Sequence, residues 1–192
     1  NRPSGIEIPE TTPELTTEDP ERSAMGQGTN SYSNVQLSRY VAAIANSGTV
    51  YDLSLLDKMT DSEGNLIKDF TPEVTGHVDI ADSTWDAVHQ GMRAVVTDGS
   101  VNKIFKDLEG EIAGKTGTAQ ESRTRGNHAF FISYGPYTNP EICVTVNIPY
   151  GYSSSNAAMV AKNVYRFYYG YTDLDSILGN GALEVSNVRV GD

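Results

Sequence analysis

The sequence predicts an α+β fold in which an antiparallel sheet is flanked by helices. Three short apolar segments follow one another within residues 111–148, and polar turns separate them, as is typical of antiparallel strands. Longer segments at 34–46, 82–98 and 156–169 carry apolar residues at the three- and four-residue spacing of amphipathic helices. Helices of this kind are expected to cover the sheet.

Composition narrows the functions that the chain can have. Its 192 residues suit one domain or a large part of one, and 38% hydrophobic residues are enough for folding. The 14 basic residues are outnumbered by 25 acidic ones, a net charge of −11, which argues against nucleic acid as a partner. No apolar run approaches the length of a membrane span. Cys143 lies in an apolar segment and is expected to be buried and inert.

The first quarter of the chain predicts a surface segment and then a helix. Residues 1–24 hold four of the eight prolines and six acidic residues without helical or strand periodicity, which predicts an extended segment. The helix at 34–46 is predicted to have Asn34 as its N-cap and Gly48 at the C′ position. Its predicted buried face consists of Leu37, Tyr40, Val41 and Ile44.

The middle of the chain predicts a hairpin and a second helix. Residues 50–70 are expected to form a β-hairpin around the turn residues 61–65, without a catalytic role. The helix that follows is capped by Asp82 or Ser83. Its apolar stripe is predicted to be Trp85, Val88, Met92 and Val95. Because His89 lies off this stripe, we expect it to be exposed rather than catalytic.

Three strands are predicted at 111–118, 128–134 and 141–148, with the first at the edge of the sheet. The polar turn after the first strand carries Arg123 and Arg125. These arginines are placed to meet an anionic substrate, but an ordinary solvated turn is the preferred interpretation.

The last predicted helix, at 156–169, is expected to pack across the sheet and to end at Gly170. Its apolar residues are Met159, Val160, Val164, Phe167 and Tyr168. Residues 171–192 predict a tail of uncertain order.

The stretch Lys115-Thr116-Gly117-Thr118 on the first strand carries the chemistry. Side chains alternate along a strand, so Lys115 and Gly117 point to one face and the two threonines to the other. An ammonium group, two hydroxyls and free edge N–H groups suit an anionic ligand with an amide-like carbonyl. The alternative is an ordinary solvated strand with a single lysine.

Other stretches occur with K-T-G in the order found in one family. They are GIEIP at 5–9, MGQG at 25–28, QL at 36–37 with AAIANSG at 42–48, GMRAVV at 91–96, and HAFF at 128–131. With K-T-G, one of the motifs of penicillin-binding proteins and serine β-lactamases, they resemble the C-terminal half of the transpeptidase domain of class B penicillin-binding proteins. The resemblance implies a partial serine β-lactamase-like fold over residues 25–170.

The resemblance also implies a reaction and its site residues. In the family, a serine attacks the penultimate D-Ala carbonyl of a peptidoglycan stem peptide, and β-lactams acylate the same serine. Lys115 and Thr118 would be catalytic, with the N–H of Thr118 in the oxyanion hole. Thr116, Gly117 and Thr118 would bind the substrate. No cofactor or metal is implied, and the parent protein would be anchored at the extracytoplasmic face of the bacterial membrane.

The family's S-x-x-K and S-x-N motifs are expected in a preceding N-terminal half of the domain. Three strings resemble them without matching their position: Ser100-Val101-Asn102-Lys103, Ser154-Ser155-Asn156 and Tyr32-Ser33-Asn34. We therefore expect this chain to be inactive alone and to associate into homo-oligomers through an apolar face. The alternatives are a non-catalytic module that binds peptides or partner proteins at its sheet edge and, fitting less well, a β-lactamase-type sensor or hydrolase.

Overall fold

A three-stranded antiparallel sheet forms the centre of the protein in the computed structural model, which describes residues 3–17, 20–108, 111–120 and 124–179. Its strands are β5 (Ala113–Ala119), β6 (His128–Gly135) and β7 (Ile142–Ile148), in the order β5-β6-β7. All neighbours are antiparallel. The three predicted strands are confirmed, and the strand that carries the motif lies at the edge of this sheet.

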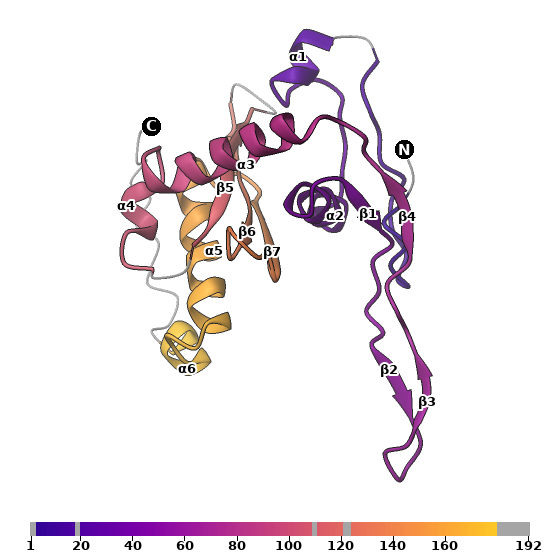
Figure 1. Cartoon of the computed structure of the whole chain (residues 1–192). Helices are drawn as coiled ribbons and strands as arrows, with labels where there is room; N and C mark the ends of the chain where they lie inside the picture. Colours follow the sequence, from indigo (N-terminus) through magenta and orange to yellow (C-terminus); the bar gives the residue numbers. More distant parts are fainter. Residues whose placement is uncertain (1–2, 18–19, 109–110, 121–123, 180–192) are drawn as a thin grey trace.

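Helices cover both faces of the sheet, which confirms the predicted α+β fold (Figure 1). The helices α2 (Asn34–Ala45) and α3 (Asp82–Thr97) lie against one face, and α5 (Ser154–Tyr168) lies against the other. Successive side chains of β6 point to opposite faces of the sheet, so the core has two parts. Tyr134 is buried with α2 and α3, whereas Phe131 is buried with α5.

A slender two-stranded arm projects from the body of the molecule (Figure 1). The strands β2 (Lys58–Thr60) and β3 (Leu66–Asp69) form it, and β1 (Thr49–Tyr51) pairs with β4 (Val74–His77) at its base. The predicted hairpin is thereby confirmed, although β2 and β3 alone flank its turn and β1 pairs with β4 instead. The carboxylate of Asp61 accepts the backbone N–H groups of Glu63 and Asn65, and these bonds close the turn.

Three short helices were not predicted. They are α1 (Pro20–Ala24), α4 (Asn102–Phe105) and α6 (Leu174–Leu178). The segment 1–24 was expected to be wholly extended, and α1 shows that this is wrong at its end. A helix of one turn is too short to show a 3.6-residue period, so the sequence carried no signal for it. The part of the predicted tail at 180–192 lies outside the described residues.

The ends of α2 differ from the prediction by one residue. Ser33, not Asn34, is the N-cap: its hydroxyl accepts the N–H of Gln36, whose side chain accepts the N–H of Ser33. At the other end Asn46 is the C-cap, so the C′ position belongs to Ser47, at φ 59°, rather than to Gly48.

The buried face of α2 is also rotated from the predicted one. Val41 and Ile44 are buried as expected, but Gln36 replaces Tyr40, which is 57% exposed. The amide of Gln36 reaches inward to donate to the carbonyl of Thr11 at 2.7 Å. A polar side chain therefore occupies a buried position that apolar periodicity assigned to its neighbours, because a hydrogen bond offsets its burial.

The helix α3 buries Trp85 and Met92, as predicted, whereas Val88 is exposed and Val96, which was not predicted, is buried. Its N-cap is Ala81, without a side-chain cap, so neither predicted capping residue has that role.

The expectation that His89 is exposed is wrong. Its Nε2 lies 2.7 Å from the carbonyl oxygen of Ile44, and its ring packs between Trp85 and Tyr134. His89 therefore bridges α3 to α2 and to the sheet, a contact that helical periodicity alone does not show.

The helix α5 packs across the sheet as predicted, but through other residues than those expected. Its buried residues are Ala157, Ala158, Ala161 and Tyr165. The residues predicted to be apolar contacts are each at least 39% exposed: Met159, Val160, Val164, Phe167 and Tyr168. Small side chains let the helix approach the strands closely, which leaves the large apolar ones on the outer surface.

Candidate active site

The motif Lys115-Thr116-Gly117-Thr118 occupies the middle of β5. Among the residues that the structure describes, β5 pairs with β6 alone, so its other edge keeps unpaired backbone groups. Lys115 and Thr118 are exposed, and Thr116 and Gly117 are half-buried. The predicted combination of an edge strand with accessible polar side chains is therefore present.

The pairing with β6 assigns each motif residue to a face of the sheet. Thr116 is opposite Phe131, which packs with α5, and Lys115 is opposite Ile132, which packs with α2 and α3. Because directly opposed residues point to the same side, Lys115 and Gly117 belong to the α2–α3 face. Thr116 and Thr118 belong to the α5 face.

The ammonium group of Lys115 lies along its own strand. Its Nζ donates to the carbonyl oxygen of Thr116 at 2.8 Å. The cation is exposed in this arrangement. It is therefore placed beside the polar backbone of the edge strand, where an anionic group would be attracted to it.

Gly117 lets β5 and β6 approach each other closely. A Cβ added at this position would lie 3.2 Å from Cβ of Phe130. The absence of a side chain also leaves the strand surface next to Lys115 open, which suits close approach by a ligand.

The turn after β5 is less ordinary than predicted. Arg125 donates from Nη1 to the hydroxyl of Tyr150 at 2.9 Å, and its guanidinium lies 5.7 Å from the centroid of that ring. Arg123 lies outside the described residues. The contact joins residues 25 positions apart, so no local pattern in the sequence indicates it.

The three strings that resemble S-x-x-K or S-x-N have structural roles. Asn102 donates to the carbonyl of Thr97 at the end of α3. Ser33 caps α2, and Asn34 donates to the carbonyl of Thr145 at 3.0 Å. Asn156 donates to Gly151 at the start of α5 at 2.8 Å. These side chains therefore make hydrogen bonds at helix ends, and the absence of a catalytic role remains a prediction.

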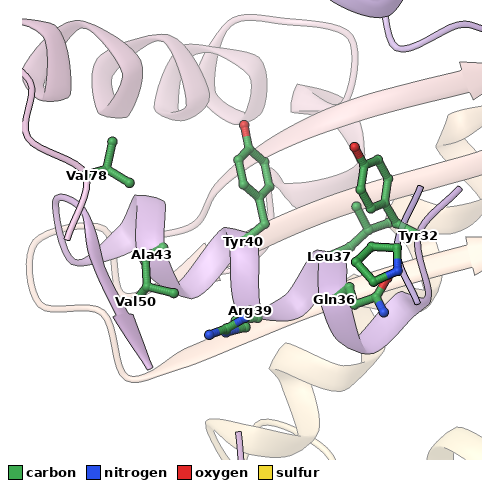
Figure 2. Close-up of a pocket in the computed structure, with 9 residues that line it drawn as sticks. Tyr32, Gln36, Leu37, Arg39, Tyr40, Ala43, Val50 and Val78 are labelled. Atoms are coloured by element: carbon green, nitrogen blue, oxygen red, sulfur yellow. The ribbon is translucent and has the colours of Figure 1, made fainter. Parts of the chain in front are cut away.

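A pocket of about 450 Å³ lies beside α2, away from the motif (Figure 2). It is lined by Pro13, Tyr32, Gln36, Leu37, Arg39, Tyr40, Ala43, Val50 and Val78. Its walls are mostly apolar, and Tyr32 and Tyr40 project along one side of it (Figure 2). None of the four motif residues contributes to it, so this pocket is distinct from the candidate site.

Two further features of the described part of the chain bear on function. No group of three or more His, Cys, Asp or Glu residues there is arranged to hold a metal ion. None of the described helices combines the length and the apolar character needed to cross a bilayer.

The sequence matches the family described as the penicillin binding protein transpeptidase domain over residues 2–166. Penicillin-binding protein 2B of Streptococcus pneumoniae (serotype 2, strain D39) is 31% identical over 162 residues, covering 77% of this chain and 24% of that protein. Peptidoglycan D,D-transpeptidase MrdA of Haemophilus influenzae is 30% identical over 171 residues, covering 75% and 25%. The chain thus spans about a quarter of the length of these curated relatives.

The fold is similar to that of solved relatives as well. Penicillin-binding protein 2B of Streptococcus pneumoniae strain R6 superposes with a TM-score of 0.76 at 26% identity, covering 89% of this chain and 30% of that one. Sequence and fold therefore agree with the resemblance inferred from the motifs. The chain belongs to the penicillin-binding protein transpeptidase family, is similar to its class B members, and covers part of the domain.

Proposed function

We propose that this chain is the ligand-binding part of a serine-type peptidoglycan D,D-transpeptidase. The whole protein would cross-link stem peptides that end in D-Ala-D-Ala and would be acylated by β-lactams. It would act at the extracytoplasmic face of the bacterial membrane. The observation that carries the proposal is the K-T-G-T motif on an open edge strand, within a domain that matches the transpeptidase family.

The motif residues suit an acyl-transfer site. The exposed ammonium of Lys115 lies along the strand beside the carbonyl of Thr116, where it would attract the carboxylate of the ligand and stabilise negative charge near the reacting centre. The hydroxyl of Thr118, and to a lesser extent that of the half-buried Thr116, would bind that carboxylate. The N–H of Thr118 would be one donor of the oxyanion hole. Gly117 would keep the strand open to the ligand.

The nucleophile is proposed to come from an S-x-x-K motif other than the strings in this chain. Of those, only Ser100-Val101-Asn102-Lys103 has the required spacing, and its Val101 is fully buried while Asn102 is bonded to the end of α3. We therefore expect the chain alone to form no acyl-enzyme, because the covalent route needs an activated serine.

Incubation with a fluorescent penicillin, followed by a denaturing gel and intact-mass measurement, tests this proposal. The chain alone should remain unlabelled, and the full-length protein should form a one-to-one adduct. Replacing Thr118 with Val in the full-length protein removes the hydroxyl and keeps the backbone N–H, so it tests the carboxylate contact. Labelling should slow by roughly 10- to 100-fold, the value of one hydrogen bond to a charged group. A stoichiometric adduct on the chain alone would contradict the assignment and make Ser100 the first residue to replace.

The second candidate function is a non-catalytic module that binds peptides along the free edge of β5. The same experiment separates the two. A full-length protein that binds D-Ala-D-Ala peptides but is never acylated would favour the module, whereas labelling that D-Ala-D-Ala peptides suppress would favour the transpeptidase.

A further inference from the structure

Three side chains gather at the end of the sheet where the motif strand ends. Arg125 donates to the hydroxyl of Tyr150 at 2.9 Å and lies over its ring. The rings of Tyr150 and His128 are 5.0 Å apart, and the backbone N–H of Tyr150 points to Nδ1 of His128 at 3.4 Å. We refer to Arg125, His128 and Tyr150 as the strand-end cluster.

Backbone contacts fasten the same two segments together. The N–H of Tyr152, in the loop between β7 and α5, donates to the carbonyl of Asn127 at 3.0 Å. Gly126 lies so close to the ring of Tyr152 that an added Cβ would be 2.9 Å from it. The loop after β7 is thus held against the residues that precede β6.

The loop adopts an unusual backbone to make these contacts. Tyr150 has φ 56° and Tyr152 has φ 64°, in the left-handed region that bulky residues rarely adopt. Such conformations persist where the surrounding contacts impose them, and they concentrate at functional sites. In this loop the left-handed residues are the two tyrosines that reach across to residues 125–128.

The cluster is directly connected to the motif strand. His128 is the β6 residue opposite Ala119, which follows Thr118 in β5. The motif strand is held by hydrogen bonds to β6 on one side, and the ends of such edge strands tend to open locally. A contact that fixes His128 therefore restrains the last paired residue of β5.

We propose that Arg125 and Tyr150 are positioning residues that hold the end of the motif strand in its binding geometry. Arg125 orients the Tyr150 ring, the ring packs on His128, and His128 holds Ala119 and thereby Thr118. The benefit to the ligand rests on the proposed function of β5, whereas the restraint of the strand does not. A ligand that meets an already ordered strand loses less free energy in ordering it.

Hydrogen exchange of this chain tests the restraint by itself. Replacing Tyr150 with Phe removes the hydroxyl that Arg125 contacts and keeps the ring, and replacing Arg125 with Ala removes its partner. Both variants should accelerate exchange of peptides covering 113–120 by roughly 2- to 10-fold, the range that the loss of one hydrogen bond supports. The double variant should add little to the Arg125→Ala change, because that change already removes the hydrogen bond that Tyr150→Phe breaks.

The matched control replaces Tyr168, an exposed tyrosine near the far end of α5, with Phe. It should leave exchange in 113–120 unchanged. If the cluster variants accelerate exchange at 149–153 and not at 113–120, the cluster holds only its own loop and the proposal is overturned. Additive effects in the double variant would equally contradict a single shared contact.

The full-length protein then tests the consequence for the ligand. The Tyr150→Phe protein should be acylated by a fluorescent penicillin several-fold more slowly at low drug concentration, with its melting temperature nearly unchanged. Equal acylation rates despite faster strand exchange would overturn the positioning role. If the unmodified full-length protein is never acylated, the proposed function fails, and the exchange result still decides the restraint.

Discussion

Gly114 lies where the ring of Phe131 crosses the motif strand. A Cβ at this position would be 2.6 Å from Cζ of Phe131 and 3.0 Å from the carbonyl oxygen of Ile132. Phe131 is fully buried, so its ring has no free space into which it can move. The glycine immediately before the motif is therefore needed for packing beneath the motif rather than for contact with a ligand.

Replacing Gly114 with Ala should destabilise the chain by about 1–3 kcal/mol, the usual cost of overpacking a core. Urea unfolding followed by circular dichroism measures the change. Gly91 serves as the control, because a Cβ there meets nothing within 4 Å, and Ala is favoured over Gly in a helix. Equal stability of the Gly114→Ala chain and the original would show that Phe131 is free to rearrange.

Cys143 shows what burial does to a single ionisable group. It is partly buried next to the α2–α3 core cluster, and burial raises the pKa of its thiol to about 11. The predicted burial of Cys143 is therefore partial. A thiol with a raised pKa is mostly protonated at neutral pH and is a poor nucleophile, which agrees with the inertness predicted for it.

At the scale of elements, a buried polar contact joins α5 to the sheet. The hydroxyl of Tyr165 donates to Oγ of Ser133 at 2.9 Å, and Ser133 donates in turn to the carbonyl of Val144 at 3.0 Å. Tyr165 and Ser133 are both fully buried. This short chain of hydrogen bonds fixes the position of α5 on β6 and β7, because an unpaired hydroxyl in this core would be costly.

Replacing Tyr165 with Phe should lower the free energy of unfolding by about 0.5–1.5 kcal/mol, the net value of one hydrogen bond. Chemical denaturation of the purified variant provides the number. The same Tyr-to-Phe change at the exposed Tyr168 should have an effect close to zero. Equal effects at both positions would show that the buried bond contributes nothing to stability.

At the scale of the whole molecule, several tyrosines couple folding to alkaline pH. Burial raises the pKa of Tyr134 to about 12 and that of Tyr169 to about 12, and it raises the pKa of Tyr165 further. The same groups ionise near 10 in an unfolded chain. Their contribution to stability is therefore complete below pH 10 and is lost as the pH rises toward 12.

The urea midpoint of unfolding should accordingly fall as the pH rises above about 10. Phenolate absorbance measured in the same titration should show that tyrosines ionise on unfolding. Cys143 contributes in the same direction, because burial raises the pKa of its thiol from 9 to about 11. A Cys143→Ala chain should therefore keep most of the decrease in the urea midpoint. A midpoint that stays constant between pH 9 and pH 11.5 would contradict the assigned burial of the phenols.

The outer surface of α5 carries large apolar side chains. Five large apolar side chains are exposed there: Met159, Val160, Val164, Phe167 and Tyr168. Large apolar side chains exposed together on one helix favour association. We expect this chain to form dimers or larger assemblies that bury this face.

Sedimentation velocity over a range of protein concentrations measures that association. Replacing Val160 and Phe167 with Lys should shift the chain toward monomer without unfolding it, because both side chains are exposed. The matched control places Lys at Thr84, which is exposed on α3. A chain that remains monomeric at high concentration would exclude the predicted interface.

The spacing of apolar residues identifies a helix, but it does not identify which residues of that helix are buried. The spacing of apolar residues predicted α5 and its packing across the sheet. It nevertheless assigned Met159 and Val160 to the core in place of Ala157 and Ala161. A helix needs small residues where it lies close to a sheet, and hydropathy favours large ones. For the same reason, the predicted buried face of α2 included Tyr40 and omitted Gln36.

The sequence by itself determined the order of the three long helices and of β5, β6 and β7, the family, and the position of Lys115 to Thr118 on an edge strand. These properties depend on residues that are neighbours in the chain or that match a family motif. Tertiary structure alone decided that Thr116 and Thr118 share the face of α5, that His89 bridges α2 and α3, and that Arg125 meets Tyr150. Such contacts join distant residues, and packing selects among the many pairings that local patterns permit.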